Sequence, residues 1–322
     1  MVGPLPGQSP HPRPSVIAIG PLGRPGLGER HLSQAMSEAP PQSVEEDTTG
    51  GHFFGNFPRY YDAQFNPPSK RLPFVPRAVG VLVAEAAGDG ERPLYMLDLG
   101  CNAGDLTVAL AERVAESSGR AVHAVGIDVD ASLVARAETL VAGRDGDAAA
   151  GLSFAFLAGD ILADGVEDTL LAARGGEVPT DGASPPFDVV FCFGLVMWIH
   201  VNAGDDGLRA FLAKLGSLGA TLVLETHTWD NYRKCRSRLR RKGLPPPAAY
   251  AAMTIRNNIE EYVAEYLTDT VGLTQTAVLG VTPWGRTIAL YAHCPDLVLA
   301  ETEPETEPGP HPEPELEPAP RT

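Results

Sequence analysis

The stretch Leu97-Asp98-Leu99-Gly100-Cys101-Asn102-Ala103-Gly104-Asp105-Leu106 decides how this chain folds. A short apolar run of strand length, Leu94–Leu97, leads into it, and apolar residues recur at helical spacing after it. The pattern predicts a strand that passes through a glycine turn into a helix. Gly100 and Gly104 allow the backbone to approach a ligand closely. The helix N-terminus then presents unpaired N–H groups to polar or anionic atoms.

A second apolar run, Val122–Ile127, ends in Asp128 about 24 residues after Gly104. An acid at the end of the second strand is placed to bind a ribose. The two glycines of the turn are four residues apart without a third, which differs from the G-x-G-x-x-G of dinucleotide sites. Asp98 lies near the end of the first strand, just ahead of the turn, where it can pair with an ammonium group. The alternative is a turn that only packs the core, and Asp128 favours a nucleoside-containing cofactor instead.

This pattern resembles the first motif of class I S-adenosylmethionine-dependent methyltransferases, in which the acid corresponding to Asp98 lies near the methionine moiety. The rest of the chain alternates strand and helix, which favours a parallel sheet with helices on both faces. Further strands are expected at Leu152–Leu157, Phe187–Phe193, Thr221–Leu224, Gln275–Leu279 and Thr287–His293. We therefore expect an α/β, Rossmann-like class I methyltransferase with a mostly parallel seven-stranded sheet, closed by a hairpin at one edge.

Composition divides the 322 residues into three parts. We expect a disordered Pro/Gly-rich arm over 1–51, a methyltransferase domain over 52–295 and a disordered Glu/Pro-rich tail over 296–322. The tail holds eight acidic residues and one Arg, and so contributes −7 of the net charge of −16. As a whole, the chain does not have the charge of a nucleic-acid-binding protein.

Cysteine usage and hydropathy indicate the compartment. The four cysteines form no C-x-x-C pair, which argues against a zinc site or a disulfide framework and favours a reducing environment. No apolar run approaches the ~20 residues of a membrane span, and the N-terminus lacks the apolar core of a secretory signal. We expect a monomeric cytoplasmic protein that binds neither a metal nor a membrane.

Two further residues follow predicted strands. Asp160 comes after the third strand, where an acid can bind an adenine amino group, and a solvated turn acid is the alternative. His200 follows the fourth strand, and one hypothesis is that it acts as a general base. A lone His beside apolar residues is more often held in place by hydrogen bonds, and that interpretation is favoured here.

The segment Tyr232–Lys242 carries seven cations in eleven residues. Most charge runs are solvated helix faces. This one stands out in an acidic chain and directly follows the fifth strand, at the ligand-binding edge of an open α/β sheet. It therefore favours phosphate binding, with Tyr60, Arg233, Lys234 and Arg236 as the available donors.

Together these residues resemble the Bicoid-interacting-protein-3 family of RNA 5′-phosphate methyltransferases, over roughly Phe54 to Pro295. The motifs that recur in order are Gly55-Asn56-Phe57-Pro58-x-Tyr60, Arg71-Leu72, the glycine turn, Met197-Trp198-Ile199-His200-Val201-Asn202 and Leu224-Glu225-x-x-x-Trp229. The short arm and the Phe-Pro form of the first motif look most like the branch of small cytoplasmic enzymes that act on RNA 5′-monophosphates. The other branch caps the γ-phosphate of a nuclear small RNA.

The resemblance implies roles at the matching positions. The S-adenosylmethionine site would be lined by Arg71, Asn102, Asp128, Asp160, Ile161 and Phe193. Tyr60 and Lys234 would hold the RNA 5′-phosphate, and the substrates of this branch are histidine tRNA and precursor microRNA. The chain departs from the family at His227-Thr228-Trp229, which is usually Gln-Pro-Trp, at Asp230, and at Gln64, where an Arg is common.

The function expected is methyl transfer from S-adenosylmethionine to an oxygen of an RNA 5′-phosphate. A phosphate oxygen is already negatively charged at neutral pH, so the reaction needs alignment rather than a general base. A methyltransferase for a protein or a small molecule, with the basic helix serving solubility, is one alternative. An RNA-binding protein that has lost its chemistry is another, against which the intact Asp98, Gly100, Gly104 and Asp128 argue.

Overall fold

The computed structural model describes residues 68–294 apart from 89, 145, 148–149 and 176–183, together with residue 299. The predicted disordered arm over 1–51 and Tyr60 lie outside these residues. The acidic tail from 296 also lies outside them, except for Leu299, which packs against the core. The boundaries expected for arm, domain and tail therefore stay predictions.

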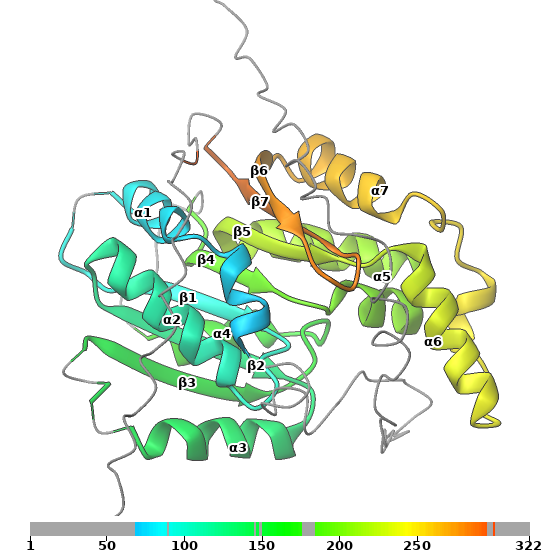
Figure 1. Ribbon diagram of the computed structural model, residues 1–322, viewed down its shortest axis with the longest axis horizontal. Coiled ribbons are helices and arrows are strands. Elements are labelled where there is room, and N and C mark those ends of the chain that lie inside the picture. The colour runs from blue at the N-terminus through cyan, green and yellow to red at the C-terminus, as the bar shows by residue number, and fades with distance from the viewer. Residues whose placement is uncertain are drawn as a thin grey trace, which may run out of the picture. The chain divides into compact units, whose positions relative to one another are not determined.

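The sheet has the expected seven strands, in the order β3-β2-β1-β4-β5-β7-β6 (Figure 1). The strands span β1 (Leu94–Leu99), β2 (Val122–Asp128), β3 (Leu152–Ala158), β4 (Phe187–Cys192), β5 (Gly219–Thr226), β6 (Thr274–Val281) and β7 (Thr287–Ala292). The pairs among β1 to β5 are parallel, whereas β7 runs antiparallel to both β5 and β6. The predicted mostly parallel α/β fold with an edge hairpin is confirmed.

Helices cover both faces of this sheet. They span α1 (Arg77–Ala86), α2 (Asp105–Ser118), α3 (Ala131–Ala142), α4 (Val166–Arg174), α5 (Val196–Leu218), α6 (Trp229–Arg241) and α7 (Ile259–Glu265). Short turns of helix are η2 (Pro68–Lys70), η3 (Leu72–Phe74), η4 (Ala248–Ala251) and the π-helical η5 (Tyr266–Thr270). None of the helices in the described part of the chain is long and apolar enough to cross a membrane.

The alternation of side chains along β1 divides the core into two layers. Leu94 and Met96 pack with α1 and α2, whereas Tyr95, Leu97 and Leu99 pack with α4 to α7. Every residue of β1 and of β4 is buried, as expected for central strands covered on both faces. The register of β1 with β2 pairs Leu99 with Ile127, so that the glycine turn and Asp128 emerge at the same edge.

The fifth strand differs most from its predicted extent. The fifth strand runs from Gly219 to Thr226 rather than from Thr221 to Leu224, because β4 pairs along one side of it and β7 along the other. Helix α5 is interrupted by a break at Gly204, which has φ +70° and ψ −168°. The helix resumes at once, because a single glycine can adopt this conformation.

Candidate cofactor and phosphate site

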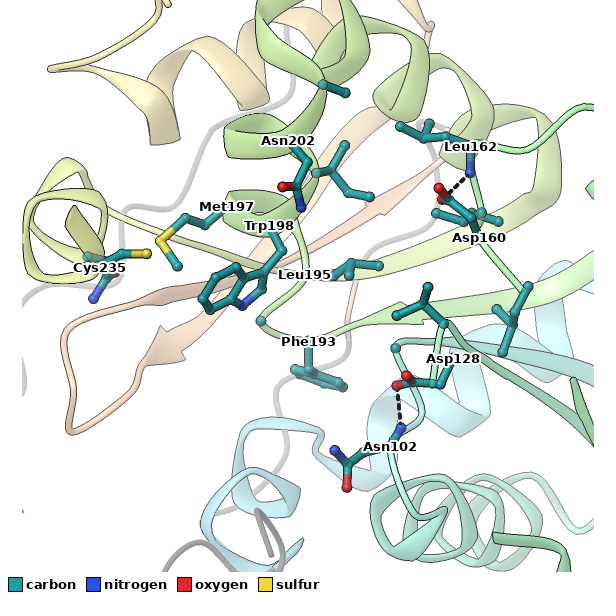
Figure 2. A pocket seen from close by; sticks show the side chains of 18 of the residues that line it. Asn102, Asp128, Asp160, Leu162, Phe193, Leu195, Met197, Trp198, Asn202 and Cys235 are labelled. Carbon is teal, nitrogen blue, oxygen red and sulfur yellow. Dashed lines mark hydrogen bonds between the residues drawn. The ribbon is translucent and has the colours of Figure 1, made fainter. Parts of the chain in front are cut away.

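A pocket opens where the carboxyl ends of β1, β2, β3 and β4 meet α5 and α6 (Figure 2). This edge contains the point between β1 and β4 at which the strand order reverses, which is where open α/β sheets bind ligands. Figure 2 shows Asn102, Asp128 and Asp160 on one side of the pocket, and Met197 and Cys235 on the other. The predicted cofactor residues that line it are Gly100, Asn102, Asp128, Asp160, Ile161 and Phe193.

The glycine turn forms one wall and holds Asp128 in place. Gly100 has φ +76° and Asn102 has φ +51°, both in the left-handed region. This turn directs the backbone N–H of Asn102 to Oδ2 of Asp128, at 2.9 Å. The N–H of Asp130 donates to Oδ1 at 3.0 Å. Each carboxylate oxygen keeps a second lone pair, so that Asp128 can also accept hydrogen bonds from a ribose diol.

The acid after β3 is less enclosed. Asp160 is exposed, and its Oδ1 accepts a hydrogen bond from the backbone N–H of Leu162 at 2.9 Å. The neighbouring Ile161 is buried, and its carbonyl accepts a hydrogen bond from Lys214 Nζ at 2.9 Å. These contacts hold the short loop after β3 rigid at the rim, where Asp160 can meet a polar edge of a base.

The remaining lining is largely apolar. Phe193 and Leu195 lie in the middle of the pocket, with Trp198 and Met197 beside them (Figure 2). Phe193 stacks on Phe191 of β4, with ring centroids 6.0 Å apart. An apolar interior flanked by two acids suits a flat nucleoside whose base stacks and whose ribose and amino group are bound at the edges.

Asp98 and Gly104, which the sequence also assigned to cofactor binding, do not line the pocket. Asp98 lies below its wall, 3% exposed, and accepts a hydrogen bond from Thr107 Oγ1 at 2.6 Å. Burial, assisted by the charge of Asp128, raises the pKa of Asp98 to about 6. Gly104 has φ +83°, and a Cβ there would lie 2.9 Å from Cβ of Ala137, so it packs the turn against α3.

Arg71 belongs to a buried cluster behind Gly194. Its guanidinium donates to Glu225 Oε2, with Nη2 at 3.0 Å, and it lies over the rings of Trp284 and Phe193. Trp284 Nε1 donates to Oε1 of Glu225 at 2.8 Å, and Arg286 Nη1 lies 3.5 Å from the same oxygen. A Cβ on Gly194 would lie 3.3 Å from Arg286 Nη1 and 3.5 Å from Arg71 Nη2. Of these two arginines, Arg286 lines the pocket and Arg71 does not.

The basic helix α6 contributes only one face to the pocket. Lys234 lines it together with Arg238, Asn231 and Cys235. Arg233 and Arg236 do not line it. Arg233 pairs with Asp230, and Arg236 lies over the ring of Tyr250, 5.4 Å from its centroid. Phosphate binding by Arg233, Lys234, Arg236 and Tyr60 stays a prediction.

Two buried histidines lie near the site, and they differ in their hydrogen bonds. His200 is fully buried, with Nδ1 3.0 Å from Tyr232 Oη and Nε2 2.9 Å from Asp205 Oδ1, which confirms the interpretation that it is held in place. Burial lowers the pKa of His200. His227 is also fully buried, and neither ring nitrogen has a hydrogen-bond partner within the described residues. Burial, together with the charges of Arg286 and Arg71, holds the pKa of His227 well below its usual range.

Several lining residues carried no functional assignment from the sequence. Asn231 and Arg238 are three and four residues from Lys234, so helical spacing alone would have grouped them. Asn202 and Trp198 belong to the quoted Met-Trp-Ile-His motif. No spacing or motif in the sequence indicated Arg286. It follows the hairpin turn and reaches the pocket only through the pairing of β7 with β5. Within the described residues, no group of side chains is arranged to hold a metal ion.

Sheet order, the antiparallel last strand, the glycine turn after β1 and the acid after β2 define a class I S-adenosylmethionine-dependent methyltransferase. A family model described as Bicoid-interacting protein 3 matches residues 187–293. An RNA 5′-monophosphate methyltransferase of Mus musculus is 34% identical over 86% of this chain and 92% of its own. The chain belongs to the Bicoid-interacting protein 3 family.

Two further relatives show the range of the likeness. A pre-miRNA 5′-monophosphate methyltransferase of Danio rerio is 32% identical over 77% of this chain and 95% of its own. The U6 snRNA methylphosphate capping enzyme Amus of Drosophila melanogaster is 28% identical over 59% of this chain and 58% of its own. The similarity to the monophosphate enzymes is therefore both higher and more extensive.

The residues present fit the cofactor of this class. Asp128 offers free lone pairs to a ribose, and Asp160 lies at the rim for an adenine amino group. Phe193 and Leu195 supply apolar surface between them, and the positive-φ Gly100 and Gly194 leave room where a Cβ would project. S-adenosylmethionine is the cofactor of this enzyme.

Proposed function

We propose that this enzyme methylates an oxygen of the 5′-monophosphate of RNA, with histidine tRNA and precursor microRNA as the substrate types. One observation carries the proposal. Lys234 and Arg238 line the same pocket as Asp128, Asp160 and Phe193. Two cations thus face the place where a nucleoside cofactor fits, which suits an anionic group brought to a methyl donor.

The chemistry asks little of the protein beyond alignment. When bound, S-adenosylmethionine supplies a sulfonium methyl that is open to in-line attack. A phosphate oxygen is already negative at neutral pH, so no side chain has to remove a proton first. This agrees with the position of His200, which is engaged by Tyr232 and Asp205 and does not line the pocket.

The task of Lys234 and Arg238 is to hold the phosphate. Lys234 is exposed and Arg238 is partly buried, so both can bind phosphate oxygens while the nucleophilic oxygen stays free. Fixing the phosphate within reach of the methyl group supplies proximity, which is worth several kcal/mol in favourable cases. Asp98, below the turn, would pair with the ammonium of the methionine moiety, and Arg71 would lie near its carboxylate. Tyr60 completes the predicted phosphate contacts.

The test is transfer of a labelled methyl group to RNA with a 5′-monophosphate, the same RNA after dephosphorylation, and the same RNA with a 5′-triphosphate. We expect labelling of the monophosphate only, and digestion to the 5′-terminal nucleotide followed by mass measurement should locate the methyl group. Equal labelling of dephosphorylated RNA would refute the proposal. Preference for the triphosphate would favour the capping branch instead.

A second experiment distinguishes RNA methylation from the alternative, a protein or small-molecule methyltransferase whose basic helix serves only solubility. Lys234→Gln should raise the KM for RNA at least tenfold and leave the Kd for S-adenosylhomocysteine within twofold. Unchanged RNA kinetics in this variant would contradict a role of α6 in substrate binding.

The compartment and assembly are also proposals. We infer that the enzyme acts in the cytoplasm as a monomer. None of its four cysteines forms a disulfide, with Cys101, Cys192 and Cys235 buried and Cys294 exposed, which supports a reducing compartment. Size-exclusion chromatography with light scattering would test the oligomeric state.

A further inference from the structure

A second, shallower groove runs along the outer face of α6. Five cations and a serine line it, namely Arg233, Lys234, Ser237, Arg238, Arg240 and Arg241. Asp230 is the one acid beside them, and it pairs with Arg233. We call this surface the outer groove. Figure 1 shows α6 extending away from the sheet, so that its C-terminal end lies well clear of the strands.

The outer groove adjoins the cofactor pocket. Lys234 and Arg238 line both of them. From Lys234 to Arg241 the helix rises by about 10 Å, at 1.5 Å per residue. A chain of phosphates whose first member lies at Lys234 can therefore continue past Arg238 to Arg240 and Arg241. Consecutive phosphates of one strand are about 3.4 Å apart along a duplex axis, so this distance covers about three phosphates.

Packing does not account for the charges of this face. The buried face of α6 consists of Tyr232, Cys235 and Leu239. Arg240 and Arg241 are exposed, and neither has an acidic partner within the described part of the chain. Cations without acidic partners gathered on one face, in a chain of net charge −16, are the footprint of a polyanion site.

The residues that line the groove also indicate which part of a nucleic acid it would contact. None of the described residues that line it is aromatic. The aromatic side chains of this region lie beneath the helix, where Trp229 stacks on Tyr232 and on Tyr250. Because aromatic side chains are the usual stacking platforms for bases, their absence among these residues favours contacts to the phosphate backbone, which are independent of sequence.

We propose that the RNA chain beyond its 5′-terminal nucleotide follows the outer groove, with its backbone phosphates bound by Arg240 and Arg241. The inference rests on the proposed function, because it takes the 5′-phosphate to be held at Lys234. It assigns to the helix two tasks at different distances from the methyl donor. The cations near the pocket hold the reacting phosphate, and those at the end of α6 hold the body of the RNA.

The test measures binding of fluorescent 5′-phosphorylated RNAs of 2, 4, 8 and 16 nucleotides by anisotropy, with the full chain and S-adenosylhomocysteine. The test variant is the double substitution Arg240→Gln and Arg241→Gln. For the 16-nucleotide RNA we expect the Kd to rise about tenfold at 0.15 M salt. The slope of log K against log salt should fall by about 1.4, since two single-strand phosphate contacts are lost. For the dinucleotide the Kd should stay within twofold.

The matched control is Arg136→Gln, which neutralises an exposed cation of α3. It should leave affinity and salt slope within error, and the thermal unfolding of all variants should match wild type. A double variant that binds the 16-nucleotide RNA like wild type, with the same salt slope, would overturn the proposal. Methyl transfer by the wild-type enzyme to 5′-phosphorylated RNA is measured in parallel. Its absence would refute the proposed function, whereas its presence with unchanged RNA affinity would refute the outer groove alone.

Discussion

At the residue scale, Asp98 is the buried side chain whose protonation we expect to affect cofactor binding. It lies below the glycine turn, where burial and the neighbouring charge of Asp128 raise its pKa to about 6, while the Thr107 hydroxyl and the charge of Arg71 act in the opposite direction. An ammonium group beside this carboxyl would favour the ionised form. Cofactor binding and deprotonation of Asp98 should therefore be coupled.

The resulting prediction concerns the affinity for S-adenosylhomocysteine between pH 5 and 8. Above pH 6 Asp98 is ionised in the free enzyme and the Kd should be constant. Below pH 6 it is protonated and must lose its proton to pair with the ammonium, so the Kd should rise up to tenfold per pH unit. Calorimetry across this range measures it.

The control for this titration is Asp98→Asn. This variant should bind more weakly at pH 7.5 and should lose the pH dependence near 6. A wild-type Kd that is the same at pH 5 and pH 7.5 would exclude Asp98 as the partner of the ammonium group.

At the scale of single elements, α2 begins and ends at glycines with positive φ. Gly104 has φ +83° and Gly119 has φ +68°. Only the first is crowded, since a Cβ on Gly104 would lie 2.9 Å from Ala137 Cβ and 3.1 Å from the ring of Phe156, whereas nothing lies within 4 Å of one on Gly119. The two ends of one helix thus separate backbone strain from steric crowding.

We predict that Gly104→Ala lowers the free energy of unfolding more than Gly119→Ala does. The left-handed conformation costs about 1–2 kcal/mol with an L side chain, and this applies to both variants. Crowding against Ala137 and Phe156 should add roughly 1–3 kcal/mol for Gly104→Ala alone. Urea unfolding of the two variants measures the difference. Equal losses would show that the turn can move away from α3 without cost.

Helix α6 depends on a chain of hydrogen bonds for its position. Tyr232 Oη bonds to His200 of α5, and His200 bonds to Asp205. Asp205 in turn accepts from the backbone N–H and the hydroxyl of Thr254, at 2.8 and 2.5 Å. This chain joins the helix that carries Lys234 to the helix that forms the adjoining wall of the pocket.

Tyr232→Phe should therefore affect substrate and cofactor differently. The substitution leaves His200 Nδ1 without its partner, which should cost about 1–3 kcal/mol of stability. It should also raise the KM for RNA several-fold while the Kd for S-adenosylhomocysteine stays within twofold, because the glycine turn is untouched. Equilibrium unfolding, RNA kinetics and calorimetry give the three values.

A matched control for this substitution is Tyr262→Phe, which removes a hydroxyl bonded to Arg209 Nε at 2.9 Å, away from the pocket. It should leave the KM for RNA unchanged. If both tyrosine variants alter the KM equally, the position of α6 does not depend on the bond to His200.

At the scale of the whole molecule, the pocket joins segments far apart in the chain. Gly100 and Asp128 come from the first half of the described domain, whereas Asn202 and Arg238 follow β4 and β5, and Arg286 immediately precedes β7. A ligand that contacts all of these walls binds only the folded protein. Cofactor binding should consequently stabilise the domain as a unit.

S-adenosylhomocysteine at 100 times its Kd should add about 2.7 kcal/mol of stability. For a domain of this size that corresponds to a rise in Tm of roughly 5–11 °C. Calorimetric scanning with and without the ligand measures the shift, and Asp128→Ala should abolish it. An unshifted Tm at a ligand concentration shown to saturate the enzyme would contradict a pocket built from both halves.

Much of this arrangement could be read from local patterns. The strand, glycine turn and helix around Gly100 follow from apolar period and glycine spacing, and the acids after β2 and β3 could be placed because parallel strands end at one edge. The extent of β5 was underestimated, since its ends are fixed by pairing with β7. The family resemblance, carried by short ordered motifs, was confirmed by comparison with its relatives.

The sequence by itself determined the fold class, the cofactor and the presence of a basic helix at the ligand edge, because each depends on residues close together in the chain. Tertiary structure alone decided which face of α6 lines the pocket, that Arg238 and Arg286 join Lys234 there, and that Asp98 lies below the wall. The physical reason is that these contacts depend on strand register and on how helices pack against the sheet. Packing sums many weak contacts between distant segments, and no local period encodes it.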